Sequence, residues 1–233
     1  MMLSHHPLFK WLLGYEIARK RDLLLAPKGP LKDFLSVPFP SVNSLFRDTN
    51  ILAVDFETTG LDAVQDKLLS VGFVELSQQQ IQLGTCYHQI INTHQKLKAD
   101  NVAIHQITDQ QQQQGQPLEV VVEHLLKALA GKVMLVHFAR IEREFLQQAC
   151  LELYGLAPSF PIIDTLVIAK RRLDKKDVAY DPSELRLGAL RKANKLPNYY
   201  AHNALNDAIA TAELLLAQTS KYSEKTVLKQ FLL

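Results

Sequence analysis

Two acidic residues, Asp55 and Glu57, come directly after the apolar segment 51–54 and directly before the turn-forming residues 58–60. In a β-strand, successive side chains point to opposite faces, so both acids project from one face and Phe56 projects from the other. Two carboxylates this close repel each other and are costly to remove from water. A divalent cation would relieve both effects, and hard oxygen ligands of this kind suit Mg²⁺ or Mn²⁺. A strand end with two solvated acids is the alternative that this pair alone does not exclude.

A third acid, Glu142, follows another apolar segment, 133–136, and lies in the first turn of a helix predicted from about residue 141 to 154. The partial positive charge at a helix N-terminus favours an acid there, so the position has a structural explanation as well as a chemical one. His137 ends the preceding strand, where it is either a substrate-binding residue or a structural histidine. Glu142 is therefore a candidate metal ligand only in combination with the other acids.

His202 and Asp207 form the last candidate group, at the start of a helix predicted from Asn203 to about residue 218. Asn203 is a good N-cap residue, which leaves His202 in the approaching loop and Asp207 inside the helix. On a continuous helix, side chains five residues apart would diverge by roughly 140°. With His202 outside the helix, the two side chains can converge. Asp207 lies among alanine, leucine and isoleucine residues, which is a poor place for an unpaired charge.

Taken together, these segments resemble the DEDDh 3′→5′ exonucleases, the DnaQ-like family that includes the proofreading epsilon subunit of bacterial DNA polymerase III. Residues 55–60, Asp-Phe-Glu-Thr-Thr-Gly, are similar to the first family motif, and His202 with Asp207 resembles the HxxxxD motif that closes the site. Residues 104–108 and 164–166 provide supporting matches. The resemblance covers about residues 50–219, and it rests on the order and spacing of several motifs.

The second motif departs from the family pattern. The family has aspartate five residues after the histidine, where this chain has Glu142, and asparagine directly after the histidine, where it has Phe138. In related enzymes this acid acts on a metal partly through water, so a carboxylate that is one methylene longer can still serve. Glu144 is a poorer substitute, because two helical steps turn it away.

The resemblance implies a ribonuclease H-like fold and hydrolysis with two Mg²⁺ ions, for which Mn²⁺ can substitute. Asp55 would bridge the ions, Glu57 and Asp207 would complete the first site, and Glu142 would support the second. His202 would accept the proton of the attacking water, a task suited to imidazole at neutral pH.

The resemblance also implies the substrate, a single-stranded 3′ end that is shortened to 5′-mononucleotides, with DNA as the first choice. Thr58, Leu61 and His105 are carried over as contacts to the terminal nucleotide, and His137 is a further candidate. An enzyme that trims RNA or degrades oligoribonucleotides is the alternative within the family. A catalytically inactive nucleic-acid-binding homologue is a second alternative, and Glu142 is the feature that favours it. The chain ends soon after the last motif, which argues against stable association with DNA polymerase III.

The candidate site residues lie on or next to predicted strands and helices. The order of these strands and helices predicts an α/β fold, with a mixed β-sheet flanked by helices. Strands are predicted over 51–54, 68–76, 81–91, 133–136 and 161–166, helices over 117–130, 141–154 and 203–218, and a solvated loop over the glutamines 110–114. The domain boundaries follow from these elements and the motifs. They are a helical and irregular N-terminal extension over 1–48, an exonuclease domain over 49–220 and a short C-terminal tail over 221–233.

Composition adds little about function. The 233 residues are 47% hydrophobic and carry a net charge of +2, which by itself does not indicate a nucleic-acid-binding protein. Basic residues gather at 19–21 and at 170–176, where each group is either a solvated helix face or a set of phosphate contacts. Two cysteines are too few for a disulfide framework, and the sequence has neither a signal peptide nor an 18-residue apolar segment. These features predict a cytoplasmic protein with no membrane partner.

Overall fold

The computed structural model describes residues 7–93, 107–177 and 179–233, with the side chains of residues 7–13 left undescribed. Its centre is a five-stranded sheet with the strand order β3-β2-β1-β4-β5. The first three strands pair antiparallel, whereas β4 pairs parallel with both β1 and β5. The strands are β1 (Ile51–Thr58), β2 (Leu68–Ser77), β3 (Gln80–Ile90), β4 (Val133–Val136) and β5 (Ile162–Asp164). The prediction of a mixed sheet flanked by helices is therefore confirmed, although β5 is shorter than predicted, because α7 begins at Thr165.

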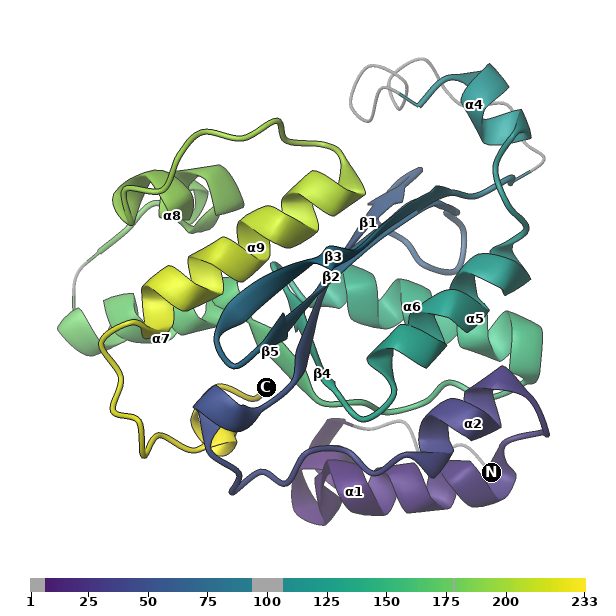
Figure 1. Cartoon of the computed structure of the whole chain (residues 1–233), viewed down its shortest axis with the longest axis horizontal. Helices are drawn as coiled ribbons and strands as arrows, with labels where there is room; N and C mark the ends of the chain where they lie inside the picture. Colours follow the sequence, from purple (N-terminus) through teal and green to yellow (C-terminus); the bar gives the residue numbers. More distant parts are fainter. Residues whose placement is uncertain (1–6, 94–106, 178) are drawn as a thin grey trace.

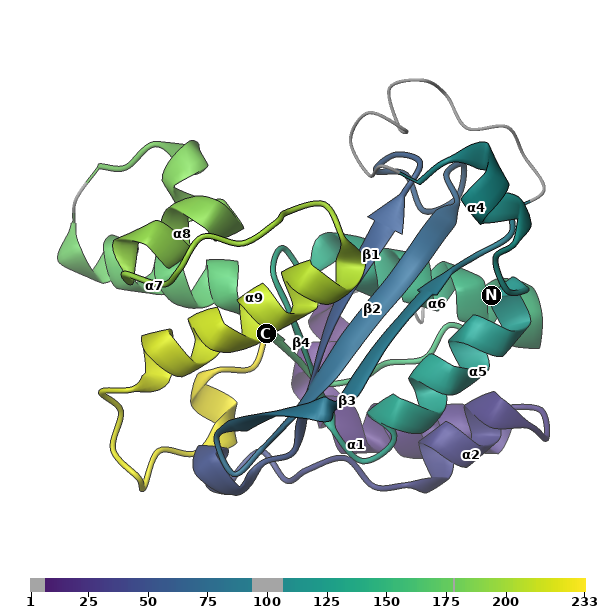
Figure 2. The same cartoon turned by 45° about the horizontal axis from the view of Figure 1, so that its top comes forward.

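Helices cover both faces of this sheet (Figure 1). One face carries α1 (Pro7–Leu25), α2 (Pro30–Ser36), α5 (Leu118–Leu129) and α6 (Arg140–Tyr154). The other carries α7 (Thr165–Lys176), α8 (Leu187–Ala193) and α9 (Ala204–Thr219), and Figure 2 shows α9 lying across the strands. The structure also contains the short 3₁₀ helices η1 (Phe46–Asp48), η2 (Pro182–Leu185) and η3 (Leu228–Gln230).

Side chains alternate along β1, so successive residues lie on opposite faces of the sheet. Leu52, Val54 and Phe56 belong to the core on the α5 and α6 side. Ile51 and Ala53 belong to the core that includes residues of α9. Asp55, which continues the second series, therefore faces the α9 side, as the period of two predicts.

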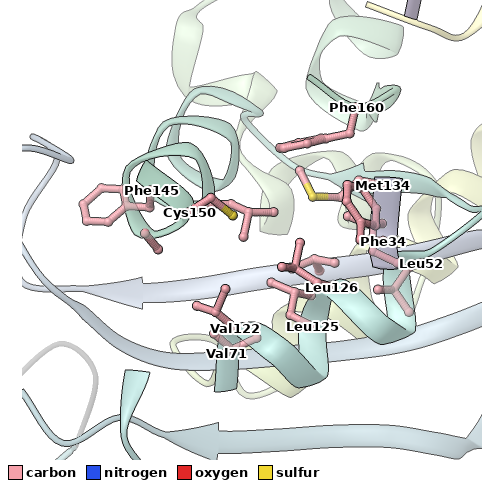
Figure 3. Packing of buried hydrophobic residues seen from close by; sticks show 14 of the residues in the cluster. Phe34, Leu52, Val71, Val122, Leu125, Leu126, Met134, Phe145, Cys150 and Phe160 are labelled. Carbon is pink, nitrogen blue, oxygen red and sulfur yellow. The ribbon is translucent and has the colours of Figure 1, made fainter. Parts of the chain in front are cut away.

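The predicted N-terminal extension packs into the main core. Leu31, Phe34 and Leu35 of α2 are at most 1% exposed, and Figure 3 shows Phe34 in the same cluster as Met134 of β4. Asp22 of α1 is fully buried and accepts a hydrogen bond from the Ser159 backbone N–H at 3.1 Å. The domain boundaries themselves stay a prediction.

Two further segments refine the predictions. The glutamines 110–114 were predicted as a loop, which is wrong, because most of them form α4 (Asp109–Gln113). Thr108 caps this helix reciprocally with Gln111. The predicted tail returns to the sheet, where Leu232 forms a β-bridge with Ile163.

Among the helices that the structure describes, none is long and apolar enough to cross a membrane.

Candidate active site

Three of the predicted acids meet at the end of β1. Asp55, Glu57 and Asp207 each offer a carboxylate oxygen, and these oxygens lie within 4.8 Å of one another. Glu57 is 5% exposed and Asp207 is 9% exposed, so neither is a solvated surface acid. The predicted convergence of residues 150 positions apart is thus present in the structure, and it creates a donor set that fits a hard divalent cation.

The entry into α9 places Asp207. Asn203 caps the helix and accepts a hydrogen bond from the Asn206 N–H at 3.1 Å, as predicted. His202 has a positive φ of 64°, so the chain reverses before the helix begins and the imidazole stays outside it. The Asp207 Oδ2 accepts hydrogen bonds from the backbone N–H groups of His202, at 2.8 Å, and Asn203, at 3.2 Å. The carboxylate therefore also holds the loop that carries His202.

Close packing between α9 and β2 brings Asp207 to β1. Gly72 lies opposite Asp55 in the β1–β2 pairing. A Cβ atom on Gly72 would lie 2.2 Å from the backbone of Ala204 and Leu205, at the start of α9. A glycine at this position is what permits the helix to approach the sheet.

Glu142 lies next to the three-acid group but is not a member of it. It is 3% exposed in the first turn of α6, and its Oε2 has no hydrogen-bond partner among the described residues. Its charge is the largest neighbouring contribution that raises the pKa of Asp55. A buried carboxylate oxygen without a hydrogen-bond partner is costly, so a nearby cation would stabilise Glu142.

Asp164 is a positioning residue that the sequence identified only as a supporting match. It is 3% exposed at the end of β5 and accepts hydrogen bonds from the backbone N–H groups of Phe138, Ala139 and Leu166 at 2.8–3.1 Å. It thereby caps α7 and also holds the turn that leads into α6. The signal in the sequence was an aspartate between an apolar strand and a helix, which is typical of an N-cap.

We expect Asp164→Asn to lower both stability and activity. An amide has one acceptor oxygen, so at least one of the backbone N–H groups would face an amide nitrogen. The loss is expected to be about 2–3 kcal/mol of unfolding free energy, because the lost hydrogen bonds involve a charged acceptor. Thermal unfolding and nuclease assays measure the two effects. Asp174→Asn, at an exposed acid on α7, is the control, and equal melting temperatures for both variants would contradict the role of Asp164.

A cavity of about 1000 Å³ opens beside the acids. Asp55, Glu57 and Asp207 line it together with His137 and His202. The side of the cavity formed by α8 and the 195–203 segment adds Arg186, Lys192 and Tyr199, among other residues. The structure therefore joins the acidic group to a space large enough for a nucleotide.

The predicted binding residues differ in their relation to this cavity. His137 lines it, and its Nδ1 lies 2.8 Å from the Thr165 Oγ1. Burial lowers the pKa of His137, which favours the neutral ring. Two other predicted contacts, Thr58 and Leu61, do not line the cavity. The Thr58 hydroxyl donates to the Gly60 carbonyl at 2.7 Å, and Leu61 is exposed. His105 lies outside the described residues.

The acids repel one another in the absence of a cation. Burial, followed by the charges of Glu142, Asp207 and Glu57, raises the pKa of Asp55 well above its ordinary value. Burial is also the main cause that raises the pKa values of Glu142 and Asp207. Asp55, Glu142 and Asp207 thus each have a higher pKa in the folded chain than in the unfolded chain.

This arrangement predicts an unusual pH dependence. Between the ordinary and the raised pKa values, the folded protein binds more protons than the unfolded protein, so the free energy of unfolding falls as the pH rises. In chelator, we expect Asp55 to destabilise the folded protein as the pH rises above the ordinary aspartate pKa of about 4, so stability should be lower at pH 7.5 than at pH 5. Mg²⁺ should stabilise the protein more at pH 7.5, by about 2–3 kcal/mol at a hundredfold excess over its dissociation constant.

Melting curves of the wild type and Asp55→Asn at both pH values, with and without Mg²⁺, isolate this effect from other titrating groups. An equal Mg²⁺ shift in the two proteins would contradict the assignment.

Comparisons with known proteins agree with this geometry. A family model described as Exonuclease matches residues 52–215. The PolC-type DNA polymerase III of Thermotoga petrophila is 30% identical over 176 residues, which cover 76% of this chain and 12% of that protein. The 3′-5′ exonuclease DinG of Staphylococcus haemolyticus is 26% identical over 177 residues, which cover 76% of this chain and 19% of that protein. The chain spans less than a fifth of the length of either relative.

Among solved structures, the nuclease domain of 3′hExo, a DEDDh family member bound to rAMP, superposes with a TM-score of 0.64 at 15% identity. The match covers 79% of this chain and 98% of that one. The mixed sheet flanked by helices is the ribonuclease H-like fold. The chain belongs to the exonuclease family whose model spans residues 52–215, a family of enzymes that hydrolyse nucleic acids.

Proposed function

We propose that the chain is a divalent-metal-dependent 3′→5′ exonuclease that shortens single strands, preferably DNA, to 5′-mononucleotides. The observation that carries this proposal is the convergence of three carboxylates within 4.8 Å beside a cavity of about 1000 Å³. The polarity of digestion is supported by the relative named as a 3′-5′ exonuclease, and the choice of DNA by the PolC-type relative. Association with DNA polymerase III is not part of the proposal.

Two cations fit the acids that are present. Asp55, Glu57 and Asp207 would hold the first, and Asp55 with Glu142 would hold the second. When bound, the cations would lower the pKa of a water molecule and neutralise charge on the scissile phosphate. Mg²⁺ is the expected ion and Mn²⁺ a substitute, because both prefer carboxylate oxygens.

His202 would act as the general base. Its imidazole is exposed at the cavity, and its backbone is held by Asp207, so it lies next to the acids without belonging to the rigid helix. In that position it can accept the proton of the attacking water and pass it to solvent.

Substrate contacts are available on the other side of the cavity. Arg186 and Lys192 are exposed cations there that suit backbone phosphates. Phe138 is 45% exposed at the cavity and can pack against a terminal base. The replacement of the family asparagine by Phe138 thus supplies an apolar surface. His137 is a further contact, whereas Thr58, Leu61 and His105 stay predictions.

An exoribonuclease is the second candidate, because the structure of the 3′hExo domain holds rAMP. The deciding experiment is a time course on matched, 5′-labelled DNA and RNA single strands with Mg²⁺, Mn²⁺ or chelator. We expect ladders of shortened strands with either metal, none in chelator, and faster digestion of DNA. A strand blocked at its 3′ end is the control. Binding of strands without release of mononucleotides would favour the inactive homologue instead.

Glu142 provides a graded test of the second cation. We expect Glu142→Ala to lose about 10–100-fold in rate, because an acid that acts partly through water contributes less than a direct ligand. Glu142→Asp, which restores the residue of the family motif, should lose less. Single-turnover rates across a Mg²⁺ titration measure this, and the alanine variant should require more Mg²⁺. A rate for Glu142→Ala equal to that of the wild type would exclude the assigned role.

A further inference from the structure

A second cleft, of about 360 Å³, lies between α7 and the segment that follows α9. Arg171, Arg172 and Lys175 of α7 line one side of it, and Tyr222 and Phe231 line the other. None of these residues lines the active-site cavity. The proposed mechanism does not involve any residue of this cleft.

The cleft is positively charged without local compensation. Among the described residues, neither arginine nor Lys175 has a carboxylate within ion-pair distance, since Asp174 on the same helix pairs with Lys170 at 2.8 Å. Residues 165–176 include five lysines and arginines against one aspartate, and residues 220–233 include three lysines against one glutamate. The whole chain has a net charge of only +2, so its positive charge is concentrated on this flank.

The two arginines are held in place by groups that do not neutralise them. The Arg171 guanidinium donates to the backbone carbonyls of Gln230 and Leu232 at 3.3–3.4 Å. The Arg172 guanidinium donates to the Gln218 carbonyl and lies 5.6 Å from the centre of the Tyr222 ring. These contacts orient the two guanidinium groups but leave their positive charge available. Such an arrangement is expected of a surface that binds anions.

The other basic group of the sequence does not share these properties. Arg19 is 5% exposed, forms an ion pair with Glu16 and donates to the Leu35 carbonyl, so it fastens α1 to α2. Arg21 pairs with the buried Asp22 at 2.5 Å. Of the two basic groups, the one on α7 is therefore the candidate for phosphate contacts.

We propose that this cleft binds the phosphate backbone of the strand under digestion, several nucleotides away from the cleaved end. The inference rests on the proposed function. The N-terminus of α7 adjoins the active site, because Thr165 contacts His137 there. At 1.5 Å per residue, Arg172 and Lys175 lie about 10–15 Å further along the helix. Tyr222, which is 41% exposed beside Arg172, adds an aromatic surface, and cationic grooves with aromatic side chains are typical of single-strand binding.

Two neighbouring lysines provide a matched test. Lys175 and Lys176 are both exposed on α7, but only Lys175 lines the cleft. Fluorescence anisotropy in chelator, where no cleavage occurs, would measure the binding of labelled dT4 and dT20 to the wild type, Lys175→Glu and Lys176→Glu. We expect Lys175→Glu to weaken dT20 binding about five- to tenfold and to reduce the salt slope by about 1. Lys176→Glu should change it less than twofold, and dT4 should bind all three proteins equally.

Arg171→Gln serves as a second variant, because it removes charge but retains a donor for the carbonyls of the C-terminal segment. It should weaken dT20 binding while the melting temperature stays close to that of the wild type. Equal effects of the two lysine variants, or an unchanged salt slope, would overturn the proposal. Displacement of dT20 by a polyglutamate peptide at matched charge concentration would assign the cleft to an acidic protein instead.

The binding assay of the lysine variants tests the cleft separately from the digestion assay, which tests the proposed function. If the wild type releases no mononucleotides but the lysine variants differ in binding, the proposed function fails and the cleft stands. If the wild type digests strands and the lysine variants bind alike, only the cleft assignment fails.

Discussion

Replacing Asp55 by asparagine is expected to abolish nuclease activity and to stabilise the metal-free protein. Asp55 is the acid on which the other three charges act, so it lies at the centre of the group. An amide of the same size keeps the packing but binds a hard cation weakly. We expect a rate loss of at least about 1000-fold, comparable to or larger than the loss of a main electrostatic contact in an active site.

The gain in stability separates this effect from misfolding. Removing one of several repelling buried charges should raise the melting temperature in chelator, whereas a folding defect would lower it. Asp33→Asn, an exposed acid on α2, is the control for charge removal and should retain activity. Activity of Asp55→Asn within tenfold of the wild type would refute the proposed metal centre.

Substitution of Gly72 by alanine should have the largest effect on the fold. The new Cβ would meet the backbone of Ala204 and Leu205 at 2.2 Å, and a backbone cannot turn aside as the end of a side chain can. The start of α9 would have to move away from β2. We expect a loss of about 3 kcal/mol or more, at the upper end for overpacking of a well-packed interior. The melting temperature should fall by about 6–12 °C.

The same shift should also reduce activity, because it separates Asp207 from Asp55. Mn²⁺ affinity and activity per folded molecule would show this separately from stability. Gly84→Ala is the matched control, since no atom lies within 4 Å of a Cβ built on this glycine of β3. Similar melting temperatures for the two variants would show that α9 tolerates displacement.

The sequence alone predicted the strands of the mixed sheet and the three acids that lie together at the end of β1. The period of two placed Asp55 and Glu57 on one face of a strand, and Ile51 and Ala53 of the same face belong to the core that includes residues of α9. Asn203 predicted where α9 begins and kept His202 outside it, as its φ of 64° confirms. These predictions succeeded because strand alternation and helix capping depend on residues close together in the chain.

Only the tertiary structure decided which residues support that site. Gly72 is one of nine glycines in the sequence, and its importance comes from a helix that begins more than 130 residues later. The two basic groups look alike as sequences, yet Arg19 is buried in an internal contact and Lys175 faces a cleft. Local patterns cannot make these distinctions, because close approach and burial depend on how distant segments pack together.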